Sequence, residues 1–346
     1  MSAPKPIQIV GGGLAGLTLG IALRRRQIPA TIYEAGNYPR HRVCGEFISG
    51  RGQSSLARLG LSELIENAGS ICANSAAFFT ASQSGRAHTL PVSAICLSRY
   101  KLDSALCNEF KRLGGELVSG QRWREDNFAE GFVRAGGRRV QVEQGSERWF
   151  GLKIQARNVT LAADLEMHLS RQGYVGICRL NDGEVNVCGL FRRRLGENAP
   201  ADSRELLRGE PGSPLRERLA DAKFDDASFC AVAGLSLKPQ RALARPEVCV
   251  GDAITMIPPV TGNGMSMAFE SAELAVAPLA AWSRGAISWN EARTEIASAC
   301  DEQFFRRLRW ARALQQLMFT SSLHAPMLWL ADHSDLFWRL AFERTR

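Results

Sequence analysis

Long apolar runs are missing from this chain of 346 residues. No uninterrupted stretch approaches the roughly 18 apolar residues that a helix needs to span a bilayer. The first residues, MSAPKP, lead straight into an apolar segment and lack the basic region and long hydrophobic stretch of a secretory signal. We therefore expect a protein that is soluble or at most peripheral to a membrane.

The cysteines lack the spacing of a metal site, because no CxxC pair occurs among them. Several stand in apolar, strand-like segments, which is typical of reduced thiols in a cytosolic protein. We expect no metal and a cytoplasmic location. The nine positions are Cys44, Cys72, Cys96, Cys107, Cys178, Cys188, Cys230, Cys249 and Cys300.

Basic residues exceed acidic ones, which gives a formal net charge of +8. Such a charge attracts a phosphate-bearing cofactor, an acidic substrate, a carrier protein or a membrane surface, and it does not choose among them. No feature indicates a nucleic-acid partner. The length exceeds what one hydrophobic core usually fills, so we expect two closely joined domains.

A glycine-rich turn near the N-terminus has the pattern of a dinucleotide-binding loop. It stands between an apolar strand, residues 7–10, and a helix, residues 14–26. Gly11 permits the tight turn, Gly13 lets backbone amides approach a pyrophosphate, and Gly16 lets the helix pack closely on the strand. Glu34 ends the next strand, where a carboxylate accepts ribose hydroxyls and disfavours a 2′-phosphate.

A second segment, far along the chain, decides between FAD and NAD. The strand at residues 248–250 is followed by Gly251 and Asp252, then by the glycine-rich turn at 257–265. A carboxylate at the end of a strand can hold the ribityl chain of a flavin, and the turn can present amides to the flavin pyrimidine. NAD enzymes do not require such a segment, so we predict non-covalently bound FAD.

Together these motifs resemble the flavoproteins that include the geranylgeranyl reductases and the aromatic hydroxylases of the p-hydroxybenzoate type, over most of the chain to about residue 285. The resemblance implies an α/β fold: a Rossmann-like FAD-binding domain of the GR2 type, an inserted antiparallel β-sheet substrate domain and a helical C-terminal tail. We assign residues 1–74, 98–148 and 240–288 to the FAD-binding domain. Residues 75–97 and 149–239 form the substrate domain, and 289–346 form the C-terminal segment.

The resemblance also implies site residues. The stretch from Arg42 to Glu46 would run past the flavin ring, with Arg40 or Arg42 facing the phosphates or the ring. Arg99 would lie beside the pyrophosphate. The complete set of expected cofactor-binding residues is Gly11, Gly13, Leu14, Ala15, Gly16, Glu34, Ala35, Arg42, Val43, Cys44, Gly45, Arg99, Gly251, Asp252, Pro259, Gly262, Asn263, Gly264 and Met265.

Three residues are candidates for catalysis. Cys44 could tune chemistry at the ring or could be a small buried hydrophobe. Glu46 could donate a proton over the flavin or could be an exposed loop carboxylate. Tyr174 could project over the substrate or could pack in the core. His168 is expected to be structural rather than catalytic.

Two departures from the resemblance shape the functional prediction. The usual mid-chain Asp-Gly pair of the hydroxylases is replaced by the segment 135–138 (AGGR). Residues 173–179 (GYVGICR) take the place of the reductase strand signature, but Gly176 and Arg179 replace its tryptophan and proline. The halogenase segment Trp-x-Trp-x-Ile-Pro is absent. The leading prediction is a reductase or dehydrogenase acting on a hydrophobic or polyketide-like small molecule, with NADPH or NADH as a transient electron donor. A flavin-dependent monooxygenase is the alternative, and a non-catalytic flavin-binding protein is the second alternative.

The tail from Phe304 to Phe342 combines apolar residues at helical spacing with several arginines. Its apolar face could pack against the FAD-binding domain or close the substrate pocket, which we favour, or it could rest on a membrane surface. The run Arg192–Arg194 is expected to be a solvated face or a contact for a carrier-bound substrate.

Overall fold

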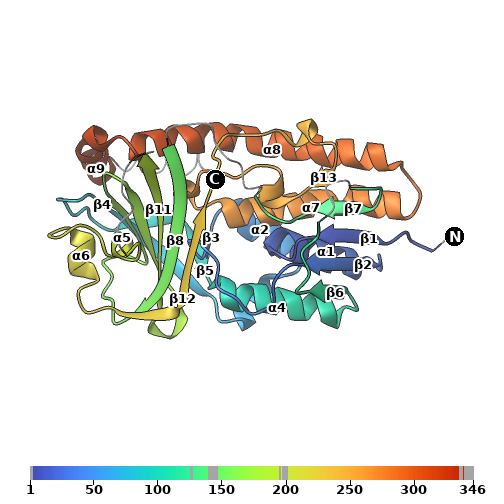
Figure 1. The fold of residues 1–346 in the computed structure, drawn as a ribbon, viewed down its shortest axis with the longest axis horizontal. Coiled ribbons are helices and arrows are strands. Elements are labelled where there is room, and N and C mark those ends of the chain that lie inside the picture. Colours follow the sequence, from blue (N-terminus) through green and yellow to red (C-terminus); the bar gives the residue numbers. More distant parts are fainter. Residues whose placement is uncertain are drawn as a thin grey trace.

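The computed structural model describes residues 3–124, 128–138, 147–194, 196, 202–334 and 338. Within these residues the strands form two sheets, one of five strands and one of eight. Figure 1 shows the two sheets next to each other, with the long helix α8 (Trp289–Met318) running along one side of both. The fold class expected from the sequence is confirmed.

The five-stranded sheet is parallel throughout and has the strand order β13-β7-β1-β2-β6. Helix α1 (Leu14–Arg25) packs against α4 (Arg99–Arg112) and α7 (Gly264–Ser283). Because parallel strands need crossover connections, neighbouring strands come from distant parts of the chain. The strands are β1 (Ile7–Val10), β2 (Ala30–Glu34), β6 (Glu116–Ser119), β7 (Phe132–Arg134) and β13 (Val248–Cys249).

The eight-stranded sheet has the order β12-β8-β11-β10-β9-β4-β5-β3. Its neighbours are antiparallel except for β4 and β9, which are parallel. The turn between β10 and β11 holds Asp182 at φ 59° and Gly183 at φ 71°, the left-handed conformation that the Asp-Gly pair predicts. The strands are β3 (Phe47–Ile48), β4 (Ile71–Phe79), β5 (His88–Cys96), β8 (Glu147–Arg157), β9 (Leu165–Leu169), β10 (Gly173–Arg179), β11 (Val185–Arg194) and β12 (Lys223–Ala233).

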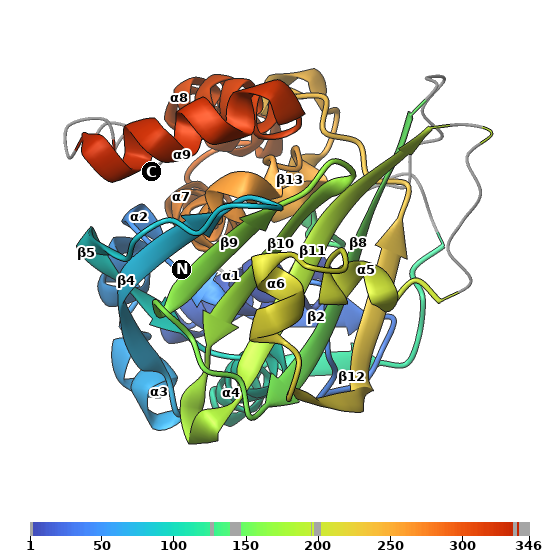
Figure 2. The ribbon, with the colours of Figure 1, turned by 90° about the vertical axis from the view of Figure 1, so that its left-hand side faces the viewer.

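The two faces of this sheet have different neighbours. In Figure 2 the short helices α5 (Glu205–Arg208) and α6 (Pro214–Arg218) lie in front of the sheet, and the parallel sheet lies behind it. Since side chains alternate along a strand, Val175 packs towards α6 with Leu215, whereas Tyr174 packs with Val260 and Phe319 on the opposite face. We call the face that carries Tyr174 the inner face.

The structure confirms the long amphipathic helix that the sequence predicts in the C-terminal region. A capping box between Ser288 and Glu291 starts α8, and α9 (His324–His333) follows it. Trp338 stacks on His88 with ring centroids 4.8 Å apart. The rest of the predicted tail, residues 335–337 and 339–346, lies outside the described residues.

The remaining helices of the described chain, α2 (Arg51–Arg58) and α3 (Ser62–Asn67), lie between β3 and β4 in the chain. None of the helices in the described ranges combines the length and apolarity required to cross a bilayer.

Candidate functional site

The glycines of the N-terminal loop differ in their surroundings: two of them are packed against the backbone, and one faces open space. A Cβ on Gly16 would lie 1.9 Å from the Gly11 carbonyl oxygen, and one on Gly11 would lie 2.4 Å from the backbone of Ala135. A Cβ on Gly13 would meet nothing within 4 Å. Gly13 is also the N-cap residue of α1, which has no side-chain cap and no acid in its first turn. The loop therefore presents backbone amides to a space that suits an anion.

Glu34, at the end of β2, is buried beside this loop. Its Oε2 accepts a hydrogen bond from the Gly12 amide at 2.8 Å, and its Oε1 accepts one from the Gly36 amide at 2.9 Å. Burial alone would raise the pKa of Glu34, but the Gly36 amide and the guanidinium groups of Arg40 and Arg42 lower it. The carboxylate is ionised where the motif requires an acceptor for ribose hydroxyls, and Ala35 follows it at the surface.

The second segment meets the glycine loop directly. Gly251 follows β13 with φ +63°, and a Cβ on it would lie 2.9 Å from Cβ of Ala15. The turn continues through Pro259 to Gly262, where a Cβ would strike the ring of Phe47. The glycine loop and the segment 251–265, which are far apart in the sequence, thus lie against each other. We call the surface that they form the wall.

The helix that follows repeats the features of α1. It begins at Gly264, which faces open space, and has neither a side-chain cap nor an acid in its first turn. Asn263 precedes it and Met265 is buried in its first turn. The wall therefore has two helix N-termini that no N-cap side chain caps, and helix N-termini of this kind can donate backbone hydrogen bonds to a phosphate-bearing cofactor.

Asp252 carries the negative charge of this wall. It is partly buried, and burial raises its pKa to about 6 against the opposing effect of the Arg138 and Arg99 guanidinium groups. A carboxyl whose pKa is strongly shifted by burial and by specific charged neighbours is a candidate for a functional site. Arg138 belongs to the departing segment 135–138, and its sequence position did not reveal that its guanidinium group lies close enough to Asp252 to lower the pKa of that carboxyl.

Replacing Asp252 with asparagine is expected to stabilise the apoprotein at pH 8 by roughly 1–2 kcal/mol, with allowance for solvent screening. The folded-state pKa of about 6 lies above the ordinary 3.8, so the carboxyl contributes stability below 3.8 that is lost as the pH rises through 6. Urea unfolding from pH 4 to 8 should show a difference that grows up to about pH 6.5 and then levels. A difference independent of pH would contradict the raised pKa.

Arg99 is held in place by its own helix. It is the first residue of α4, and its guanidinium group forms two hydrogen bonds with Asp103, at 2.7 and 2.9 Å. Arg42 bonds the same carboxylate at 3.1 Å and lies 3.7 Å from Glu34. Asp103, which the sequence did not reveal as important, therefore fixes both predicted arginines beside the wall.

Glu46 is buried, so the alternative of an exposed loop carboxylate is wrong. Its side chain is 0% exposed, and its φ of +61° turns the backbone sharply. Oε1 accepts a hydrogen bond from the Arg99 amide at 2.9 Å, and Oε2 accepts one from Gln155 at 3.2 Å. Burial raises the pKa of Glu46, while Lys153 lowers it. Its predicted role as a proton donor stays a prediction.

Lys153 is the partner that the sequence did not predict. It is 0% exposed, its Nζ lies 3.5 Å from Glu46 Oε1, and it donates a hydrogen bond to His41 Nδ1 at 3.0 Å. Burial and the Lys153 charge lower the pKa of His41, so this imidazole is neutral and accepts through Nδ1. The contacts of Lys153 thus connect the buried Glu46 with the partly exposed, neutral His41.

Cys44 lies against this network as a neutral thiol. Its Sγ accepts a hydrogen bond from the Glu46 amide at 3.5 Å, and its carbonyl accepts one from Asn186 at 2.9 Å. Burial raises the pKa of Cys44, although the nearby Arg99 lowers it. Its neighbours Val43 and Gly45 pack against Gly151 and Phe47. The geometry leaves both predicted roles of Cys44 open, and a thiolate is disfavoured.

Tyr174 lies on the inner face in an apolar cluster. Its side chain is 5% exposed, and its hydroxyl has no hydrogen-bond partner among the described residues. Two residues further along the same face, a Cβ on Gly176 would meet no atom closer than 3.7 Å. The cluster also contains Val260, from the turn after Asp252, and Met318 and Phe319, at the end of α8. A polar group without a partner in an apolar setting is a plausible contact for a ligand.

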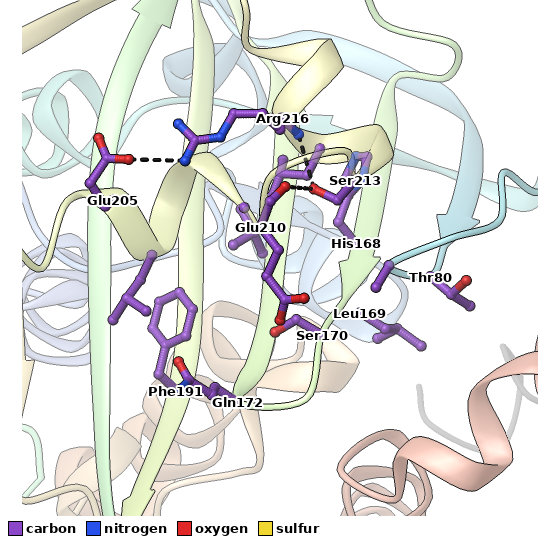
Figure 3. Close-up of a pocket in the computed structure, with 15 residues that line it drawn as sticks. Thr80, His168, Leu169, Ser170, Gln172, Phe191, Glu205, Glu210, Ser213 and Arg216 are labelled. Atoms are coloured by element: carbon purple, nitrogen blue, oxygen red, sulfur yellow. Dashed lines mark hydrogen bonds and ion pairs between the residues drawn. The ribbon is translucent and has the colours of Figure 1, made fainter. Parts of the chain in front are cut away.

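His168 lies on the outer face, where it lines a cavity of about 190 Å³ below α5 and α6 (Figure 3). Its Nε2 hydrogen-bonds Glu166 at 2.9 Å, and its ring stacks on Phe79 with centroids 4.4 Å apart. Figure 3 shows Glu205, Glu210 and Arg216 at the same cavity. The volume is below the roughly 300–1,000 Å³ of most ligand pockets. The sheet separates this cavity from Tyr174.

Comparisons with known proteins agree with the fold. The family described as NAD(P)-binding Rossmann-like domain matches residues 9–45, and a search of curated proteins finds no match. Among solved structures, the flavin-dependent brominase Bmp2 has a TM-score of 0.74 at 15% identity, over 99% of this chain and 94% of that chain.

Two further solved structures are similar over most of this chain. P. aeruginosa PqsL, in complex with 2-aminobenzoylacetate, has a TM-score of 0.71 at 16% identity, over 94% of this chain and 99% of that chain. A geranylgeranyl bacteriochlorophyll reductase-like protein from Thermoplasma acidophilum has a TM-score of 0.73 at 15% identity, over 96% and 92%. The resemblance to FAD-dependent flavoproteins is thus confirmed at the level of the fold.

Proposed function

We propose that the protein is an FAD-dependent oxidoreductase. The observation that carries this proposal is the wall formed by the glycine loop and the segment 251–265, with two helix N-termini whose amides no side chain caps. Gly13 and Gly264 both face open space, so a cofactor can approach the backbone there. This arrangement supports a long cofactor with a pyrophosphate and a second polar end.

Each part of FAD has candidate partners on this wall. The amides of the glycine loop from Gly13 onward would hold the pyrophosphate, Glu34 the adenosine ribose, and Asp252 the ribityl chain, with Arg99 beside the phosphates. The amides of the 259–265 turn would face the flavin pyrimidine. When bound, FAD supplies the hydride or electron transfer, and the protein supplies binding, orientation and exclusion of water.

For the reaction we propose reduction or dehydrogenation of a hydrophobic or polyketide-like molecule. The apolar cluster around Tyr174 supports an apolar substrate, and the unpartnered hydroxyl supports one polar contact with it. NADPH or NADH is the proposed transient donor. Arg192, whose guanidinium group lies 5.8 Å from the Trp149 ring at the edge of this cluster, is the proposed contact for an acidic carrier.

A flavin-dependent monooxygenase is the second candidate. PqsL, which has a similar fold, is named elsewhere as a probable FAD-dependent monooxygenase, and its complex holds 2-aminobenzoylacetate. A reaction with O2 requires an apolar, water-poor site beside the cofactor, and the cluster around Tyr174 would meet this need as well. The geometry of the described residues supports both reactions.

One experiment separates the candidates. The protein is loaded with FAD, reduced anaerobically with NADPH or NADH, mixed with a set of aromatic, polyketide and isoprenoid compounds, and then exposed to ¹⁸O2. Reoxidation by a compound before air enters supports the reductase, whereas label in a product supports the monooxygenase. A compound that reduces the oxidised, FAD-loaded protein without air supports the dehydrogenase. A flavin-binding protein without catalysis is supported if no compound reoxidises the reduced flavin, reduces the oxidised flavin or incorporates the label. Absence of FAD binding overturns the proposal.

Replacing Tyr174 with phenylalanine is expected to leave the fold as stable or to stabilise it by up to about 1 kcal/mol, because a buried hydroxyl without a partner is removed. The KM for a substrate that bonds this hydroxyl should rise about tenfold, while FAD content stays unchanged. Thermal unfolding and steady-state kinetics measure both effects. A loss of stability above 1 kcal/mol would instead indicate that the hydroxyl is bonded within the fold.

A further inference from the structure

Exposed apolar side chains gather on one side of the molecule. Among the described residues, eight large hydrophobic side chains are exposed, and six of them belong to α8, α9 or the segment beside α8. Figures 1 and 2 both show α8 and α9 along the same side. We call these six residues the apolar surface: Leu243, Phe305, Trp310, Leu317, Trp329 and Leu330.

Helix α8 is fixed to the fold by its other face, so these exposed side chains are not displaced core residues. Phe304 and Leu308 are buried in the core of the parallel-sheet half. Between them, Arg307 forms a buried ion pair with Glu270 of α7 at 2.6 Å. Burial of one face against the fold confirms the packing role expected for this helix. The opposite face is left to the solvent.

Basic residues accompany the apolar surface. Arg306, Arg309 and Arg312 are exposed on the second half of α8, whereas the exposed acids of this helix, Glu291, Glu295 and Glu302, all precede them. The guanidinium groups of Arg241 and Arg309 lie 5.3 and 5.8 Å from the centre of the Phe305 ring. Arginines whose stems lie along aromatic rings can keep their charge in water while the rings enter an apolar phase.

We propose that the apolar surface binds the headgroup region of an anionic lipid bilayer. Exposed tryptophans favour the boundary between lipid and water, and the arginines are attracted to anionic headgroups. The charge of the whole chain, +8, has the same sign. No helix in the described residues can cross the bilayer, so the contact is interfacial.

This binding goes beyond the proposed oxidoreductase activity and does not depend on it. The end of α8 nevertheless joins the two regions: Leu317 is on the apolar surface, and the next residue, Met318, packs in the cluster with Tyr174. An apolar substrate dissolved in the bilayer would meet the protein within a few residues of that cluster.

The test is co-sedimentation of the full, FAD-loaded chain with lipid vesicles. Vesicles of phosphatidylcholine with phosphatidylglycerol are compared with vesicles of phosphatidylcholine alone, at 50 and 500 mM NaCl. We expect binding to the anionic vesicles that weakens at high salt. Sedimentation independent of lipid charge, or protein that remains in the supernatant at 50 mM NaCl, overturns the proposal.

Variants assign the binding to this surface. The double variant Arg306→Gln with Arg312→Gln should reduce partitioning into anionic vesicles roughly 30-fold, because each arginine near the surface contributes about 1 kcal/mol. The double variant Trp310→Ser with Trp329→Ser should reduce partitioning at least about tenfold. The control variants remove exposed side chains outside the apolar surface. Arg26→Gln with Lys111→Gln removes two positive charges, and Val92→Ser removes an exposed apolar side chain. Equal loss in the controls overturns the assignment.

The same variants also test two other possible partners of the apolar surface, a second copy of the chain and an acidic carrier protein. If light scattering finds a dimer that the Trp310→Ser and Trp329→Ser variant abolishes, and vesicles bind neither form, the surface joins two copies of the chain and the lipid proposal is wrong. If a purified acyl carrier protein binds in a manner that Arg306→Gln abolishes, while vesicles do not bind, an acidic protein is the partner and the proposal is again wrong. Circular dichroism and flavin content verify that each variant is folded.

Discussion

Replacing Lys153 with methionine is expected to lower the free energy of unfolding by about 3–5 kcal/mol. Methionine keeps most of the apolar stem but leaves the Glu46 carboxylate in the interior without its charged partner. A buried charge that loses its partner is costly because water cannot solvate it. Urea denaturation of the apoprotein, followed by tryptophan fluorescence, measures the loss.

The size of this defect should depend on pH. Burial raises the pKa of Glu46 in the folded chain, and removal of Lys153 raises it further. A carboxyl whose folded-state pKa is raised contributes stability at low pH that is lost as the pH rises through that pKa. The defect should therefore be greater at pH 8 than at pH 5. The double variant Lys153→Met with Glu46→Gln should recover much of the loss, because no buried charge remains.

Lys101→Met is the matched control for this prediction. Lys101 also forms an ion pair, with Asp182 at 3.3 Å, but both side chains are exposed. Exposed pairs contribute at most about 1 kcal/mol, so this variant should unfold almost as the parent does. A Lys153 variant that behaves like the Lys101 variant would show that the Glu46 site is hydrated in solution.

Replacing Gly13 with valine is expected to raise the Kd for FAD at least about a thousandfold, or ~4 kcal/mol. The new side chain would fill the space in front of the loop, where the proposed pyrophosphate would lie. The backbone of Gly13 has φ −80° and ψ −172°, which valine adopts readily. The apoprotein should thus change its free energy of unfolding by less than about 1 kcal/mol. Flavin fluorescence titration and urea denaturation measure the two quantities.

Gly16→Ala provides the contrast within the same loop. Its Cβ would lie 1.9 Å from the Gly11 carbonyl oxygen, so helix and loop must separate. This variant should lose both stability and FAD affinity, whereas Gly13→Val should lose affinity alone. If Gly13→Val purifies with a full complement of FAD, the assignment of the loop to the cofactor is incorrect.

The parts of the candidate site that follow local backbone rules could be predicted from the sequence. Gly11, Gly16 and Glu34 occupy fixed positions in a strand-turn-helix-strand unit, and their spacing alone indicates their roles. Gly251 and Asp252 follow a strand in the same way. Because parallel strands end at the same edge of a sheet, two such segments must meet, and Gly251 does pack against Ala15.

The charged network behind the site could not be predicted, because its pairs form between surfaces of different elements. Lys153 lies in a strand where a lysine is normally expected to face the solvent. The packing of other elements on this strand buries it against Glu46. Arg138 approaches Asp252 from another part of the chain for the same reason. No local pattern distinguishes a buried lysine from an exposed one until the neighbouring elements are placed.

The strand order of the parallel sheet has a consequence for biosynthesis. Strand β7 pairs with both β1 and β13, so the sheet remains incomplete until β13 at residues 248–249 has been made, followed by the turn up to Met265. On the ribosome, the glycine loop is made first, and all strands of the eight-stranded sheet are made before the segment 251–265, the other part of the wall, emerges. Pairing over such sequence distances slows folding. A nascent chain that ends before α7 would expose half of the wall, and chaperones or free flavin would first meet a complete wall only late in translation.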